Sequence, residues 1–85
     1  MQKEVVITNP LGIHSRPSGE IMKKAKIYPC MVTLTKEGRE VNAKSIVSIL
    51  TLELQCGDRV LLKTEGDREE EALQEIGDLL ESFLD

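Results

Sequence analysis

Apolar and polar positions follow two different periods along this chain, and the period changes near prolines and glycines. β-Branched residues cluster within 3–8, and apolar positions alternate with polar ones over 31–36. Between these segments, from Ser15 to about Tyr28, apolar residues recur three or four positions apart. Alternation is typical of strands, and the wider spacing is typical of one helix face. The pattern therefore predicts a strand, a helix that ends before Pro29, and a second strand.

Turn-forming residues separate the remaining elements. The Asn-Pro-Leu-Gly sequence at 9–12 predicts a loop before the first helix. The Glu-Gly pair at 37–38 predicts a hairpin turn into a strand at 39–42. The Gly-Asp pair at 57–58 predicts a turn into a fourth, aliphatic strand at 59–64.

A short second helix is predicted to start at Ser45, because serine is a favourable N-cap and an apolar run follows it directly. The run holds more apolar residues than one face of so short a helix can bury: Ile46, Val47, Ile49, Leu50, Leu52 and Leu54. Two interpretations stay open. Either all of them belong to the core, or some form an exposed cluster that binds a partner.

The last element has the clearest helical pattern. Asp67 can cap it, and Glu70 three residues later completes a capping box. An apolar stripe then continues towards the end of the chain: Ala72, Leu73, Ile76, Leu79, Leu80 and Phe83. The element order βαββαβα contains no repeat or linker, so we predict one α+β domain over residues 1–85, a small sheet covered on one face by helices.

Composition narrows the function. The chain has 85 residues, of which only Tyr28 and Phe83 are aromatic, so the core is aliphatic and too small for a deep substrate cavity. A net charge of −4 and the lack of paired aromatic residues argue against nucleic-acid binding. No segment is apolar enough to insert into a membrane, and none resembles a signal peptide. We therefore expect a cytoplasmic protein that is a monomer by default.

No metal site or cofactor is predicted. Cys30 and Cys56 lie far apart in no Cys/His ligand pattern, so we expect two reduced cysteines packed as small hydrophobic residues. The three glutamates at 69–71 are consistent with a metal site, but a solvated first helical turn that complements the helix dipole explains them better.

His14 is the first candidate for chemistry, although a lone histidine in a loop is more often incidental. It stands directly before the predicted helix, where free amides and the positive end of the dipole favour an anion. Arg16 adds a fork of donors suited to phosphate oxygens, Pro17 fits the first turn, and Gly12 permits close backbone approach. No second histidine accompanies it, so hydrolase chemistry is hard to build. These residues favour a histidine beside an anion cradle, which suits a covalently held phosphate.

Ser45 is the second candidate, and two interpretations of it stay open. As a helix cap it needs no further role. As a phosphorylation site it would receive about two negative charges beside the aliphatic cluster, and this change could switch partners without refolding the domain.

Two segments resemble one known family. Residues 11–17, which read Leu-Gly-Ile-His-Ser-Arg-Pro, resemble the phosphorylation motif of the HPr family, the histidine-containing phosphocarriers of the bacterial sugar phosphotransferase system. Residues 41–46, which read Val-Asn-Ala-Lys-Ser-Ile, resemble the family's regulatory serine region in its Gram-positive form. The resemblance extends from end to end and implies an open-faced β-sandwich, in which three helices cover a four-stranded antiparallel sheet.

The resemblance implies a carrier and not an enzyme. His14 would accept a phosphoryl group at Nδ1 from phosphorylated enzyme I and pass it to an enzyme IIA domain of a sugar permease, with Arg16 and Pro17 shaping its surroundings. Ser45 would be the target of an ATP-dependent HPr kinase/phosphorylase. That phosphorylation would slow transfer and promote binding to a catabolite-control transcription regulator. A partner-binding surface is expected at Glu20, Ile46, Val47 and Leu50.

Departures from the family pattern motivate alternatives. The Ser-Gly-Glu sequence at 18–20 replaces a more apolar stretch, Val47 and Leu50 stand where methionines are frequent, and Ser48 stands where glycine is common. One alternative is a mainly regulatory module that acts in carbon catabolite control through phosphorylated Ser45. Another is a carrier for a non-sugar branch, such as a dihydroxyacetone kinase or a nitrogen-related acceptor. A third is a generic interaction domain with an incidental histidine.

Overall fold

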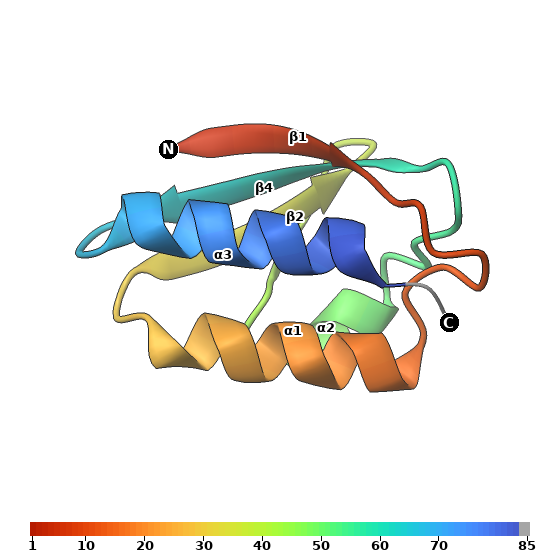
Figure 1. The fold of residues 1–85 in the computed structure, drawn as a ribbon, viewed down its shortest axis with the longest axis horizontal. Coiled ribbons are helices and arrows are strands. Elements are labelled where there is room, and N and C mark those ends of the chain that lie inside the picture. The colour runs from red at the N-terminus through yellow and green to blue at the C-terminus, as the bar shows by residue number, and fades with distance from the viewer. Residues whose placement is uncertain (84–85) are drawn as a thin grey trace.

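The computed structural model describes residues 1–83, which form one antiparallel sheet with helices on one of its faces (Figure 1). The elements are β1 Gln2–Val6, α1 Ser15–Ile27, β2 Met31–Lys36, β3 Arg39–Asn42, α2 Ile46–Leu50, β4 Arg59–Glu65 and α3 Glu69–Ser82. The strands lie in the order β1-β4-β2-β3. The predicted α+β class, the open-faced sheet and the βαββαβα order are confirmed.

The sheet has one apolar face because buried and exposed side chains alternate along its strands. In β4, Val60 and Leu62 are fully buried, whereas the residues that flank them are more exposed. The register pairs Val5 with Val60 and Leu34 with Leu62, so these side chains share the face that the helices cover. The core is mainly aliphatic, although Tyr28 and Phe83 are also buried in it. Its largest fully buried apolar side chains are Ile7, Ile21, Leu34, Ile49, Leu62, Ile76, Leu80, Val5, Val32 and Val60.

Two prolines bound α1, as the sequence predicts. Pro17 is the third residue of the helix, where a missing N–H breaks no intrahelical hydrogen bond. At the other end Tyr28 takes an extended backbone, with φ −96° and ψ 138°, as residues before proline prefer. Between them Ile21 and Ala25 are fully buried, so this helix face packs against the core.

The predicted capping box of α3 is wrong. The helix begins at Glu69, and its N-cap is Arg68, which has a left-handed backbone (φ 63°) and makes no capping hydrogen bond. The Glu69 carboxylate accepts a hydrogen bond from the amide of Gly66 at 3.1 Å, and this bond is the main cause of the lowered pKa of Glu69. A turn at Gly66 therefore places the start of the helix beyond the reach of a cap at Asp67.

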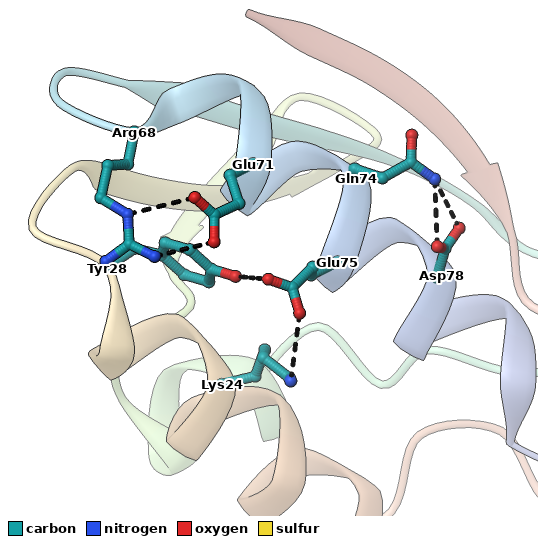
Figure 2. Close-up of polar contacts among 7 residues, drawn as sticks. All are labelled: Lys24, Tyr28, Arg68, Glu71, Gln74, Glu75 and Asp78. Atoms are coloured by element: carbon teal, nitrogen blue, oxygen red, sulfur yellow. Dashed lines mark hydrogen bonds and ion pairs between the residues drawn. The ribbon is translucent and has the colours of Figure 1, made fainter.

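A polar cluster joins the C-terminal end of α1 to α3 (Figure 2). The Tyr28 side chain is almost fully buried, and its hydroxyl donates to the Glu75 carboxylate, whose other oxygen lies 3.6 Å from Lys24 Nζ. The Arg68 guanidinium lies 4.9 Å from the centre of the Tyr28 ring and pairs with Glu71 at 2.7 Å. Burial, followed by the hydrogen bond to Glu75, raises the pKa of Tyr28 to about 12.

The stability of the fold should decrease between pH 10 and 12 because of Tyr28. The unfolded chain ionises near 10.0 and the folded protein near 12, so the contribution of Tyr28 is full below pH 10 and is lost as the pH approaches 12. Tyr28→Phe should lower the unfolding free energy by about 1 kcal/mol at neutral pH. The difference in unfolding free energy between wild type and variant should then shrink as the pH rises from 10 to 12. Urea unfolding at each pH measures it.

The phenolate absorbance provides an independent check, because the sequence contains no other tyrosine and no tryptophan. In the folded protein the phenolate should form near pH 12. Ionisation near the ordinary value for tyrosine would contradict the buried hydrogen bond.

The two cysteines differ in burial, although neither forms a disulfide. Cys30 is buried in the core, as predicted. The expectation of a buried Cys56 is wrong, because Leu54 takes the core position in this segment and the chain then turns outward. The Cys56 thiol lies at the surface, 3.8 Å from the Thr8 carbonyl oxygen.

Candidate functional site

The loop before α1 is held from within by a buried asparagine. Asn9 is fully buried, its Nδ2 donates to the Gly12 carbonyl at 2.6 Å, and the Gly12 amide donates to the Asn9 carbonyl at 2.9 Å. Ile7 fixes the start of the loop by donating to the Asp58 carbonyl and accepting from the Gly57 amide. Asn9 was not predicted as a site residue, and its position directly before a proline, where Asn often starts a turn, is the signal that points to it.

Gly12 lies against the backbone of the segment that follows α2. The amide of Ile13 donates to the Leu54 carbonyl at 2.9 Å, and a Cβ atom on Gly12 would lie 2.2 Å from the same oxygen. The φ of Gly12 is +69°, a region that favours glycine. The close approach expected at Gly12 is therefore present, but the approaching group is the chain itself and not a visiting ligand. This contact fixes the residue at which α1 begins.

The segment that carries Leu54 is braced by an ion pair. Lys36 Nζ lies 2.8 Å from the Asp58 carboxylate and also donates to the carbonyls of Leu52 and Glu53 at 3.3 Å. The ion pair is the main cause of the lowered pKa of Asp58 and of the raised pKa of Lys36. The end of the β2–β3 hairpin thus holds the backbone against which Gly12 rests.

His14 is the N-cap of α1, as predicted. Its backbone is extended (φ −90°, ψ −166°), and its carbonyl accepts a hydrogen bond from the Ser18 amide at 3.0 Å. The half-buried side chain makes no capping hydrogen bond, and its Nε2 atom is buried without a hydrogen-bond partner. Arg16 is exposed at the second helical position and Pro17 is buried at the third, so the structure places all three predicted residues at one helix end.

The charges of the two long helices are arranged differently. The first turn of α1 contains no acidic side chain, and its last turn contains Lys24 and Lys26. The first turn of α3 contains Glu69, Glu70 and Glu71, which complement the positive end of its dipole. The positive end of α1 beside His14 lacks this compensation, so it favours an anion from outside the chain.

Ser45 is the N-cap of α2, as predicted. Its Oγ accepts a hydrogen bond from the Ser48 amide at 3.3 Å, and the residue is half-buried. The neighbouring Lys44 extends its Nζ to the Tyr28 carbonyl at 2.7 Å, which ties the start of α2 to the end of α1. The capping interpretation of Ser45 is thus confirmed, and its phosphorylation stays a prediction.

The apolar run around α2 divides between core and surface. Ile49, Leu52 and Leu54 are buried, whereas Val47 is 72% and Leu50 37% exposed. The half-buried Ile46 faces α1 at Gly19, where a Cβ atom would lie 4.0 Å from Ile46 Cδ1. We call the three residues Ile46, Val47 and Leu50 the α2 patch.

Glu20 does not adjoin the α2 patch. It is exposed on the flank of α1 that faces α3 and lines a shallow groove with Lys23, Lys24, Ile27 and Leu79. The structure therefore brings three of the four predicted partner-binding residues together and places Glu20 on another side of α1. An exposed leucine in the loop before His14, Leu11 at 72%, is a further surface residue that was not predicted.

Replacing Gly12 by alanine should displace the loop that carries His14. The new Cβ would overlap the Leu54 carbonyl oxygen, and the left-handed backbone would be strained, so we expect a loss of more than about 2 kcal/mol in unfolding free energy. Gly38→Ala is the matched control, because its φ is also positive (80°) but its Cβ would meet no atom within 4 Å. Urea denaturation measures both variants. Equal losses would show that the Leu54 contact contributes nothing.

Comparison with known proteins agrees with this geometry. A family described as "PTS HPr component phosphorylation site" matches residues 1–82. The phosphocarrier protein HPr of Borreliella burgdorferi is 40% identical over 83 residues, which are 98% of this chain and 96% of that protein. The structure of HPr-C-His from Thermoanaerobacter tengcongensis is similar with a TM-score of 0.90 and 35% identity, covering 94% of this chain and 90% of the other. The Bacillus subtilis catabolite repression containing protein Crh is similar with a TM-score of 0.80 and 30% identity, covering 99% and 97%.

The fold and these matches define a phosphocarrier, a class of carrier proteins and not of enzymes. The chain belongs to the HPr family of the phosphotransferase system. Among residues 1–83, no helix combines the length and the apolar character that crossing a membrane requires.

Proposed function

We propose that His14 carries the phosphoryl group, and that it does so on Nδ1. The Nε2 atom of His14 is buried and so is not accessible to another protein, which leaves Nδ1 as the ring nitrogen for transfer. The observation that carries the proposal is the position of His14 at the N-cap of a helix whose first turn holds no acidic side chain. That uncompensated helix end favours the negative charge of a phosphoryl group held by the histidine.

Transfer to a neutral imidazole needs no general base. The Nδ1 lone pair attacks the phosphorus of the donor, the bond from phosphorus to the donor's leaving atom breaks, and its electron pair returns to the donor. The ring keeps its proton on Nε2 and becomes positively charged. Onward transfer reverses these changes. Arg16 and the amides of the first turn stabilise the phosphoryl oxygens, and Pro17 sets the backbone around them.

The partners follow from the phosphotransferase system. The donor is enzyme I, which is itself phosphorylated by phosphoenolpyruvate, and the acceptor is an enzyme IIA domain of a sugar permease. The α2 patch supports docking beside His14, because α2 leads into the segment whose Leu54 carbonyl contacts the His14 loop. Exposed aliphatic side chains of this kind mark partner surfaces on small proteins. Glu20 lies outside this surface, on the flank of α1 that faces α3.

Replacing His14 by alanine should abolish labelling by enzyme I and phosphoenolpyruvate. His14 is the sole histidine of the sequence, so no other residue can form phosphohistidine. Wild type should gain one acid-labile phosphate per chain, measured by intact mass before and after acid treatment. A wild type that gains none, or a variant that labels equally well, would refute the proposal.

Arg16→Ala should slow phosphorylation by about tenfold to a hundredfold, because a charged hydrogen bond to the transferred group is lost. The unfolding midpoint should change little, since Arg16 is exposed. Arg59→Ala is the control, because Arg59 is also exposed and lies 3.4 Å from Glu4 on the sheet. Equal slowing in both variants would indicate a general charge effect and would remove Arg16 from the site.

A second candidate function is regulation through Ser45. Its Oγ already lies at the start of α2, and a phosphate there would add about two negative charges beside the α2 patch. The similarity to Crh, which is named for catabolite repression, favours the same assignment. The modifying enzyme would be HPr kinase/phosphorylase, and the partner of the modified protein a catabolite-control transcription regulator.

Incubation with HPr kinase/phosphorylase and ATP should add one acid-stable phosphate to wild type and to Ser48→Ala, but none to Ser45→Ala. Ser48 is the matched control, because it is a half-buried serine of α2 whose amide, and not its hydroxyl, hydrogen-bonds to Ser45 Oγ. Ser45→Asp should bind the regulator more tightly than wild type does, as titration calorimetry measures. Unchanged affinity, or equal labelling of Ser45→Ala, would count against this function.

A further inference from the structure

Three buried side-chain atoms within residues 9–18 have no hydrogen-bond partner. Within residues 1–83 these atoms are Asn9 Oδ1, His14 Nε2 and Ser18 Oγ. Buried polar atoms are nearly always paired, because an unpaired one costs free energy. All three belong to the loop and the first turns that carry the proposed phosphoryl acceptor. Their missing partners therefore point to the function of this site.

Ser18 follows His14 by four positions, which is about one helical turn. The spacing of the two residues continues through Ile21 and Ala25, which are fully buried. Ser18 is fully buried as well, and its amide already donates to the His14 carbonyl at 3.0 Å. The Ser18 hydroxyl and the Nε2 atom of His14 are thus both buried at the N-terminal end of α1.

The chemistry of transfer requires a partner for Nε2. A neutral imidazole holds its proton on one nitrogen, and the other nitrogen is the nucleophile. If Nδ1 of His14 attacks phosphorus, the proton lies on the buried Nε2, where it needs an acceptor. Asn9 Oδ1 is one acceptor, but its amide group is held by the 2.6 Å bond from Nδ2 to the Gly12 carbonyl. The Ser18 hydroxyl makes no such bond.

We propose that Ser18 is a positioning residue, whose buried hydroxyl accepts a hydrogen bond from His14 Nε2 and so keeps Nδ1 open for phosphoryl transfer. This inference rests on the proposed function of His14. The two atoms are not hydrogen-bonded in this structure. Hydrogen bonds of catalytic groups are often long before the reacting partner binds, and they tighten in the complex. Ser18 acts through the ring and does not touch the phosphoryl group.

Removing the hydroxyl should not weaken the fold. Ser18→Ala deletes a buried atom without a partner and introduces the residue with the highest helix propensity. The unfolding midpoint should therefore stay unchanged or rise. A hydroxyl with a purely structural role would instead lower it, so stability separates the two explanations.

The experiment compares wild type, Ser18→Ala and Ser15→Ala. Ser15 is the control, because it is the exposed serine directly after His14. With enzyme I and phosphoenolpyruvate, Ser18→Ala should phosphorylate about twofold to tenfold more slowly than wild type and still reach one phosphate per chain. In ¹⁵N-labelled phosphorylated protein, the Nε2 proton of wild type should exchange slowly with water, and it should exchange about tenfold faster in Ser18→Ala. Ser15→Ala should match wild type in both measurements.

The outcomes separate a failure of the proposed function of His14 from a failure of the proposed role of Ser18. If wild type accepts no phosphate, the proposed function of His14 fails. If wild type is phosphorylated on His14, but Ser18→Ala shows the same rate and the same Nε2 exchange, the role of Ser18 is overturned. A lower unfolding midpoint in Ser18→Ala with unchanged Nε2 exchange would also overturn it, because the hydroxyl would then serve the fold alone.

Discussion

The contact between Gly12 and the Leu54 carbonyl determines where the functional end of this molecule lies. No side chain fits between the two backbones, because a Cβ atom on Gly12 would lie 2.2 Å from the carbonyl oxygen. The Ile13 amide donates to the same oxygen, so the next residue, His14, is held at the N-cap of α1. The segment that carries this carbonyl is held by Lys36 at the turn end of the β2–β3 hairpin, which pairs with Asp58 and donates to the Leu52 carbonyl. The position of one imidazole therefore depends on contacts from three separate parts of the chain.

The N-terminus of α1 lacks the features that usually stabilise the start of a helix. Its N-cap is a histidine that makes no capping hydrogen bond, and its first turn contains no acidic residue. A serine or aspartate cap would stabilise the helix by about 1 kcal/mol, but it would occupy the amides that a phosphate needs. The opposite end of the helix is secured by the Tyr28 cluster and by the Lys44 bond to the Tyr28 carbonyl. Local rules are commonly broken at functional sites and compensated elsewhere in the fold.

Sequence patterns predicted the elements well where the signal is local. Proline restricts the backbone of its neighbours, so Pro17 and Pro29 locate α1 within one residue. The cap at Ser45 was likewise correct, because a serine side chain reaches only the amides next to it. The predicted cap at Asp67 was wrong, because the helix begins only at Glu69, after a turn at Gly66 that the Glu69 carboxylate holds. The predicted burial of Cys56 was wrong, because Leu54 takes the core position in that segment. Both errors depend on contacts that periodicity does not contain.

The sequence by itself determined the candidate nucleophile, its helix and the serine that caps α2, because each follows from residue type and spacing over a few positions. Only the tertiary structure decided which ring nitrogen of His14 is buried, that Gly12 serves the chain's own backbone, and that Asn9 and Ser18 have buried polar atoms without partners. It also separated Val47 and Leu50, which are exposed, from Ile49, which is buried, and it placed Glu20 on the side of α3. Burial results from packing between segments distant in sequence, so no local pattern carries it.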